Sequence, residues 1–202
     1  MMHPLTAGAG FALLFLTCAS SLFAFDATSC ELKVREGFRF YDISGENLDD
    51  LKEQIRLNGT KWTDGKVYSA MTNWDIHYKY EVARQDGRYS VKSVATRVDI
   101  LYHMPRLNQA TCTPDLAGIW SNYLTQLQKH EFGHKDLAVK TASEVNEMFV
   151  TLPSFSTEEE LAAEITRRTG EKFQRLKEIQ VEYDHDTRHG ETQGAILVAG
   201  KQ

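Results

Sequence analysis

The stretch of residues 113–149 contains no helix-stopping signal, and it constrains the fold more than any other part of the chain. Thr113 is suited to cap a helix, and Pro114 is suited to its first position. Nothing interrupts the helical pattern before Pro153. The stretch therefore predicts one long helix.

A second helix is predicted shortly after Pro153. Ser156 or Thr157 can cap its first turn, and Glu159 or Glu160 can close a capping box. Apolar residues then recur on one face of the helix, at Leu161, Ile165, Leu176, Ile179 and Tyr183.

The earlier part of the chain predicts strands. Residues 31–45 have strand character, and residues 46–59 change to the period of a short helix. From Val67 apolar and polar residues alternate, an Asp-Gly turn follows at residues 86–87, and a second alternating strand runs to Pro105. The predicted fold is α+β. It has an antiparallel sheet, the long helix packed against it and a second C-terminal helix, in a zincin-like arrangement.

The N-terminal segment differs in composition from the rest of the chain. No Lys, Arg, Asp or Glu precedes Asp26, and FALLFLTCASSLFAF is an apolar run that ends close to small residues. This run is shorter than the roughly 20 residues of a membrane span and fits the core of a secretory signal peptide. We predict a signal peptide at residues 1–24 and one secreted or periplasmic domain at residues 25–202. An uncut anchor and a lipid on Cys18 are the alternatives.

The net charge of the chain narrows the class of partner. The net charge is −5 and there is no basic patch, which argues against nucleic acid as a partner. Once the leader is removed, no stable membrane insertion is expected.

Cys30 and Cys112 remain after the leader. Because exported chains meet an oxidising compartment, we predict a disulfide between them, the alternative being two buried thiols.

The sequence QKHEFGHKDL places a His-Glu-x-x-His motif within the long predicted helix. Residues four apart on a helix are neighbours, so His130 and His134 can direct a ring nitrogen at one Zn²⁺. Both fall on the apolar face of the helix. Gly133 between them is costly in a helix interior, which predicts the close approach of a metal shell or a strand.

Glu131 lies one step around the helix from His130, so it is poorly placed as a third ligand to the same ion. It can instead reach a water on the open side of the metal and take its proton. Zinc lowers the pKa of such a water to about 7 and polarises a carbonyl. The motif therefore predicts zinc-dependent hydrolysis with Glu131 as general base.

A third zinc ligand is expected from the end of the second helix. Residues 182–190, EYDHDTRHG, concentrate acidic and imidazole groups, and two antiparallel helices would bring them beside the motif. Asp184 or His189 is the expected ligand, with the other supporting a ligand imidazole. Glu164 is a further acidic candidate. Tyr183 is a candidate donor to a developing oxyanion.

Several segments together resemble a known family. They are, in order, YDISG, TNWDIHYKY, ILYHMP, IWSNYLTQLQKHEFGH and YDHDTRHGETQGAIL. They are similar to a bacterial family of predicted secreted zinc-dependent proteases, formally a domain of unknown function, over about residues 31–198. The resemblance implies an exported metalloprotease in which the two histidines bind zinc and the glutamate is catalytic. It favours Asp184 over His189 as the third ligand.

The sequence thus predicts a zinc metallopeptidase that acts on protein or peptide substrates. Two alternatives stay open. One is a zinc amidase that acts on cell-wall peptides. The other is a non-catalytic, zinc-stabilised envelope binding protein, which would have a closed site with four protein ligands.

Overall fold

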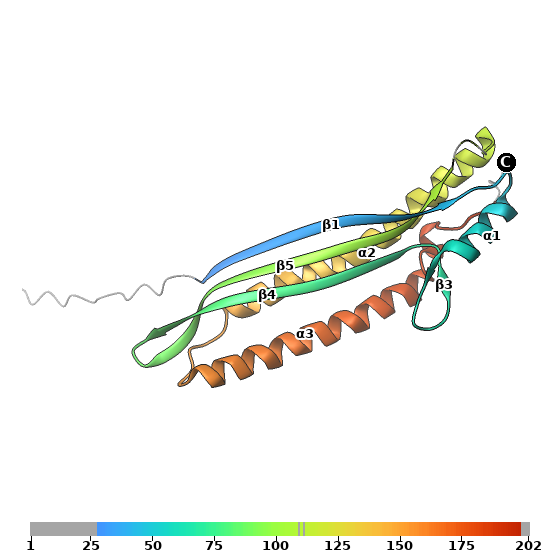
Figure 1. Cartoon of the computed structure of the whole chain (residues 1–202). Helices are drawn as coiled ribbons and strands as arrows, with labels where there is room; N and C mark the ends of the chain where they lie inside the picture. Colours follow the sequence, from blue (N-terminus) through green and yellow to red (C-terminus); the bar gives the residue numbers. More distant parts are fainter. Residues whose placement is uncertain (1–27, 109, 111, 199–202) are drawn as a thin grey trace, which may run out of the picture.

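The computed structural model describes residues 28–108, 110 and 112–198. The predicted signal peptide lies outside these residues. Within them, the larger sheet consists of β1 (Ser29–Ile43), β4 (Met71–Gln85) and β5 (Arg88–Leu107), in the order β1-β5-β4. The strands are long, and Figure 1 shows them running side by side along most of the molecule.

The sheet is mixed, which corrects the prediction of an antiparallel sheet. β4 and β5 form the predicted antiparallel hairpin, with left-handed backbone at Asp86 (φ 51°) and Gly87 (φ 75°) in its turn. β1 pairs with β5 in parallel, with Ser29 opposite Ser93 and Ile43 opposite Leu107. The reason is the connection: β4 starts at the end of the sheet where β1 finishes, so β5 returns in the direction of β1.

The connection between β1 and β4 forms a small substructure at that end of the sheet. It contains α1 (Leu48–Asn58) and a short hairpin of β2 (Thr60–Lys61) and β3 (Val67–Tyr68). The side chain of Asn47 caps α1 by accepting hydrogen bonds from the backbone N–H groups of the first turn.

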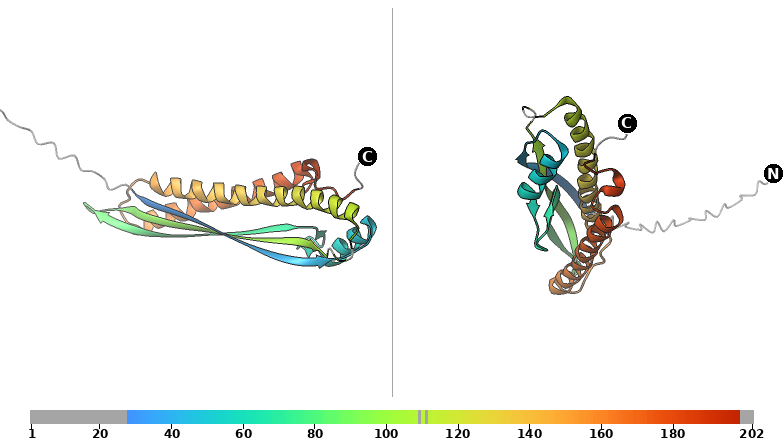
Figure 2. Two further views of the ribbon diagram at one scale, coloured as in Figure 1. Left: turned by 90° about the horizontal axis from the view of Figure 1, so that it is seen from above. Right: turned by 90° about the vertical axis from the view of Figure 1, so that its right-hand side faces the viewer.

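Two long antiparallel helices cover one face of the sheet, and Figure 2 shows the two layers from above and from the end. α2 (Pro114–Val150) is capped by Thr113, and α3 (Glu158–Thr187) is capped by Thr157, as the sequence predicts. α3 runs back along α2 and finishes near the middle of it, where the 3-10 helix η2 (Glu191–Gln193) follows. No helix among the described residues combines the length and apolar character needed to cross a bilayer.

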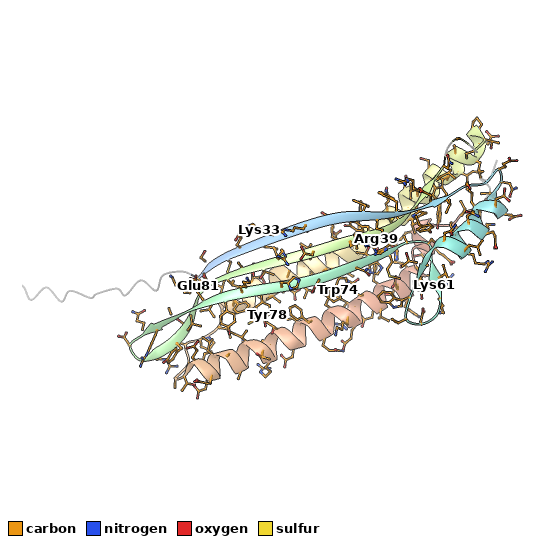
Figure 3. All side chains as sticks on the ribbon, in the orientation of Figure 1. Lys33, Arg39, Lys61, Trp74, Tyr78 and Glu81 are labelled. Carbon is orange, nitrogen blue, oxygen red and sulfur yellow. The ribbon has the colours of Figure 1, made fainter. Side chains whose placement is uncertain are left out.

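The core lies between the sheet and the helices. Alternate residues of β5 are buried beneath α2, including Val98, Ile100, Tyr102 and Met104. At the far end from α1, Val94 packs in a second cluster with side chains of α2 and α3. Figure 3 shows Trp74 and Tyr78 along β4, and the Tyr78 hydroxyl lies 3.2 Å from Thr169 Oγ1 of α3.

The predicted disulfide is wrong. Cys30 and Cys112 are both free thiols. Cys30 Sγ lies 4.0 Å from the carbonyl oxygen of Asn146, near the end of α2, whereas Cys112 Sγ lies 3.4 Å from that of Thr113, the cap at its start. The 37 residues of α2 span about 55 Å at 1.5 Å per residue, far more than the separation that a disulfide bridges.

Candidate metal centre

The His-Glu-x-x-His motif lies on the side of α2 that faces into the protein. His130 is 2% exposed, Glu131 is 3% exposed and His134 is 9% exposed. The same helix face buries Trp120 and Leu127 before the motif. Polar side chains at this depth need partners, because burial without a hydrogen bond or a counter-charge is costly.

Asp184, in the last turn of α3, supplies a carboxylate to both histidines. Its Oδ1 atom lies 3.1 Å from His130 Nε2 and 3.0 Å from His134 Nε2. The two Nε2 atoms are 3.3 Å apart. One ligand atom from each of these residues therefore falls within a cluster that could hold a metal ion.

The spacing of this cluster fits a tetrahedral zinc ion. Ligand atoms at about 2.0–2.1 Å from Zn²⁺ in tetrahedral geometry lie about 3.3–3.4 Å from one another. The three separations in the cluster, 3.3, 3.1 and 3.0 Å, are close to that value. Two imidazoles and a carboxylate are also a donor set that suits zinc. The residues present therefore fit a divalent cation.

The outer ring nitrogen of each histidine is held by a glutamine. His130 Nδ1 is 3.0 Å from Gln193 Oε1, and His134 Nδ1 is 2.5 Å from Gln180 Oε1. An amide oxygen only accepts, so each Nδ1 carries the proton and donates it, a tautomer assigned from this network. In the neutral imidazole the Nε2 lone pair then faces the site and can bind a metal, and when the ring is protonated the Nε2–H donates to Asp184 instead. Gln180 also donates through Nε2 to the backbone oxygen of His134, at 3.0 Å.

We expect Gln180→Leu to weaken zinc binding by about 10–100-fold, because it removes the acceptor that orients His134. A chelator competition titration measures this change. Gln174→Leu is the matched control, since Gln174 is an exposed glutamine on the same helix. Equal affinities for the two variants would contradict an orienting role for Gln180.

Tyr183 packs between α3 and the motif. Its ring is stacked on that of His130, with centroids 5.0 Å apart and planes 8° apart. Its hydroxyl donates to the backbone oxygen of His130 at 3.2 Å and accepts from Gln193 Nε2 at 3.0 Å. A Cβ on Gly133 would lie 2.1 Å from this hydroxyl oxygen. Gly133 therefore serves the close approach of a tyrosine, where the sequence predicted a metal shell or a strand.

Gly133→Ala should lower the free energy of unfolding by about 1–3 kcal/mol, because the added methyl group overlaps the Tyr183 ring. Gly118→Ala is the control on the same helix, where a Cβ meets nothing within 4 Å. That variant should gain about 0.5–1 kcal/mol from helix propensity. Urea unfolding of both variants measures the difference. A stabilising Gly133→Ala would disprove the packing role of Gly133.

The turn after α3 brings η2 back to the motif. Arg188 (φ 50°), His189 (φ 52°) and Gly190 (φ 88°) are all in the left-handed region. A Cβ on Gly190 would lie 3.1 Å from Cβ and Cγ of His130. The turn therefore passes close against His130, and this passage places Gln193 on its ring.

Glu131 is held by β4. Thr72 donates through Oγ1 to Glu131 Oε2 at 2.7 Å and lies 3.1 Å from the Glu131 backbone oxygen. Burial raises the pKa of Glu131 above its ordinary value, although the Thr72 hydrogen bond and the histidines oppose the rise. A buried carboxyl beside a cluster that could hold a metal, with its affinity for a proton raised, is suited to act as a base.

Asp184 and His134 stabilise each other's charged forms. Burial alone would raise the pKa of Asp184, but hydrogen bonds from His130 and His134 hold it far below its usual range. Burial likewise opposes protonation of His134, yet the hydrogen bond and charge of Asp184 raise its pKa overall. The cluster therefore keeps an anion at its centre that attracts positive charge.

The cluster opens into a cleft of about 640 Å³ between the start of β4, the β2–β3 hairpin, α2 and α3. This volume is within the range of small-molecule and cofactor sites. His130, Glu131, His134 and Asp184 all line the cleft. The remaining lining residues are Trp62, Tyr68, Ser69, Ala70, Met71, Thr72, Asn73, Trp74, Leu127, Lys177, Gln180, Val181 and His189.

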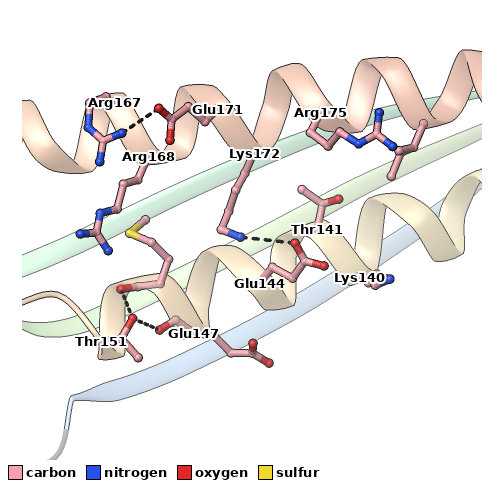
Figure 4. Close-up of a pocket in the computed structure, with 12 residues that line it drawn as sticks. Lys140, Thr141, Glu144, Glu147, Thr151, Arg167, Arg168, Glu171, Lys172 and Arg175 are labelled. Atoms are coloured by element: carbon pink, nitrogen blue, oxygen red, sulfur yellow. Dashed lines mark hydrogen bonds and ion pairs between the residues drawn. The ribbon is translucent and has the colours of Figure 1, made fainter.

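A larger hollow between α2 and α3 has a different character (Figure 4). Two pairs of its charged side chains are joined across or along the helices. Lys172 Nζ lies 3.3 Å from Glu144 Oε2, and Arg167 lies 2.7 Å from Glu171. Such pairs are typical of a solvated helix surface. The convergent chemistry is therefore in the smaller cleft.

Comparison with known proteins identifies the family. The profile of a family described as Bacterial protein of unknown function (DUF922) matches residues 38–190. The chain belongs to this family. The match contains the motif on α2 and reaches the turn after α3. Searches of curated proteins and of solved structures found no match for the chain.

In this DUF922 protein, Asp184 and His189 occupy different positions around the cluster. Asp184 belongs to the group that could hold a metal, together with the two histidines. His189 Nδ1 lies 3.4 Å from Asp184 Oδ1, and its ring lies against Tyr68 with centroids 5.2 Å apart. The side chain of His189 is 53% exposed, so it stands at the mouth of the cleft.

The structure places Tyr183 where it positions His130. Its hydroxyl is bonded to His130 and Gln193 and is absent from the lining of the cleft. It therefore contacts His130 and Gln193 rather than the cleft, and the oxyanion role stays a prediction. The reason is that Tyr183 lies one residue before Asp184 on α3, so its side chain points about 100° away around the helix.

Sequence reasoning missed Gln180, Gln193 and Thr72. Gln180 has a weak signal, because it lies four residues before Asp184 and so on the same face of α3. Gln193 reaches the motif only through the left-handed turn after α3, and Thr72 only through the packing of β4 on α2. Neither contact can be predicted from the local sequence pattern.

Proposed function

We propose that the protein is a zinc-dependent peptidase. The observation that carries the proposal is the convergence of His130 Nε2, His134 Nε2 and Asp184 Oδ1 at the base of a cleft that Glu131 also lines. A catalytic zinc site has three protein ligands and an open position. A zinc ion held there would supply a Lewis acid that acidifies water and polarises a carbonyl.

The chain's own residues would perform the proton transfers. Glu131 accepts the proton of the attacking water and returns it to the leaving amine. Thr72 fixes one carboxylate oxygen of Glu131, which leaves the other available to the cleft. Gln180 and Gln193 keep the histidines in the tautomer that binds metal, and Tyr183 holds the His130 ring in place.

The number of ligands favours catalysis over a purely structural site. A structural zinc is closed by four protein ligands. Within the described residues 28–108, 110 and 112–198, the candidate group has three members, and it faces a cleft. The non-catalytic binding protein is therefore the weaker alternative.

The zincin-like arrangement and the exported location are part of the same proposal. A motif-bearing helix beneath a sheet, with β4 at the sheet edge beside the cleft, supports the first. The apolar leader sequence supports the second. Mass spectrometry of the protein recovered from bacteria tests the location, since a cleaved leader leaves a new N-terminus near residue 25.

A cleavage assay tests the function. The zinc-loaded protein is incubated with unfolded protein substrates and, separately, with purified cell-wall peptides. We expect fragments of the proteins that disappear on addition of a chelator and return when zinc is restored. Cleavage confined to the cell-wall peptides would establish the amidase alternative. Absence of cleavage in both substrates by fully loaded protein would contradict the proposal.

A further inference from the structure

Two large apolar side chains stand exposed at the mouth of the cleft. Trp62 is 49% exposed and Val181 is 69% exposed, and both line the cleft. Val181 has the largest exposed fraction of the large hydrophobic residues that the structure describes. Exposed apolar side chains that line one cleft beside a candidate catalytic centre are typical of a binding surface.

Val181 interrupts a charged helix surface. It lies three residues before Asp184 on α3, so the two share a face of the helix. The adjoining residues Lys177, Glu178 and Glu182 are charged and exposed. Val181 belongs to neither core cluster, so packing within the described residues does not account for an apolar residue here.

Trp62 is presented by a well-bonded hairpin. The backbone N–H of Trp62 donates to the Lys66 carbonyl at 3.0 Å. The Trp62 carbonyl accepts from the Gly65 backbone N–H, also at 3.0 Å. The Tyr68 hydroxyl, at the base of the hairpin, donates to Asp64 at 2.8 Å. The hairpin therefore fixes the backbone that carries the indole while leaving half of the side chain uncovered.

The apolar surface continues from the rim toward the metal cluster. Tyr68, Met71, Trp74 and Leu127 also line the cleft. This lining is continuous with His130 and Glu131, which reach the cleft from α2. A substrate whose reacting bond lies at the cluster would thus place a neighbouring side chain against an apolar wall.

We propose that Trp62 and Val181 form a specificity subsite for a bulky aliphatic or aromatic side chain next to the reacting bond. The inference rests on the proposed function and deepens it by naming the substrate class. Desolvation of a large apolar side chain against this wall favours its binding. The subsite therefore favours polypeptide substrates with large apolar residues.

Direct binding tests the subsite independently of turnover. The zinc-loaded Glu131→Gln protein is titrated with two short peptides that differ only by Phe or Ala at the central position. We expect the Phe peptide to bind at least about 10-fold more tightly, as one apolar group can discriminate by 10-fold or more. The Trp62→Ala and Val181→Ser substitutions in the same background should each remove most of this preference without changing zinc affinity.

Leu57→Ala and Val150→Ser are the matched controls, because these residues are 52% and 50% exposed and lie outside the cleft. Both should keep the preference for Phe. Equal binding of the two peptides, or a preference that survives both Trp62→Ala and Val181→Ser, overturns the subsite. Preferential binding without any cleavage by the unsubstituted protein would uphold the subsite and contradict the peptidase function.

Discussion

Replacing Glu131 with glutamine should leave zinc binding unchanged and reduce the rate of peptide hydrolysis by about 10²–10⁴-fold. Glutamine has the shape of glutamate and can still accept the Thr72 hydrogen bond. It cannot take a proton from water. The change therefore removes the base while preserving the packing of a side chain that is 3% exposed. Steady-state kinetics and a metal titration on the same preparation measure the two effects.

Glu147→Gln is the control for this variant. Glu147 is an exposed glutamate on α2 that lines the charged hollow rather than the cleft. Its replacement should leave both turnover and zinc affinity at the level of the unsubstituted protein. If Glu131→Gln hydrolysed peptides at the unsubstituted rate, Glu131 would not be the base.

Replacing Asp184 with asparagine should weaken zinc binding by more than about 100-fold. Loss of a partner that only orients a metal ligand already lowers metal affinity by about 10–100-fold. Asp184 is itself a candidate ligand and supplies the negative charge of the group. The substitution keeps the size of the side chain. Competition with a chelator of known affinity gives the change.

Two further variants make the Asp184 result specific. Asp186→Asn alters a carboxylate that is 78% exposed on the same turn of α3, and it should have no effect on zinc binding. His189→Ala should also retain zinc binding, because His189 lies at the mouth of the cleft. Loss of zinc from His189→Ala together with its retention by Asp184→Asn would exchange the roles of these two residues.

The parts of the structure that the sequence predicted are those governed by local rules. Thr113 and Thr157 cap their helices because short polar side chains satisfy the free N–H groups of a first turn. His130 and His134 face one point because residues four apart on a helix are neighbours. Asp184 could be proposed because a second helix antiparallel to the first must end beside the motif.

The parts that the sequence did not predict depend on distant segments. The alternation in β1 is the same whether the strand pairs in parallel or antiparallel, so its direction followed only from the path of the chain into β4. A disulfide between Cys30 and Cys112 was plausible from the number of cysteines alone. In the structure the two sulfur atoms lie near opposite ends of α2. Gln180 and Gln193 carry no metal-ligand signature, since their amides bind the outer side of the imidazoles.

The metal content of the purified protein decides whether the cluster is a zinc site. Elemental analysis after equilibration with zinc and gel filtration should give one zinc ion per chain, and His130→Ala should give a value near zero. Recovery of the unsubstituted protein without a stoichiometric divalent ion, or of His130→Ala with the same content, would show that His130, His134 and Asp184 only hydrogen-bond to one another.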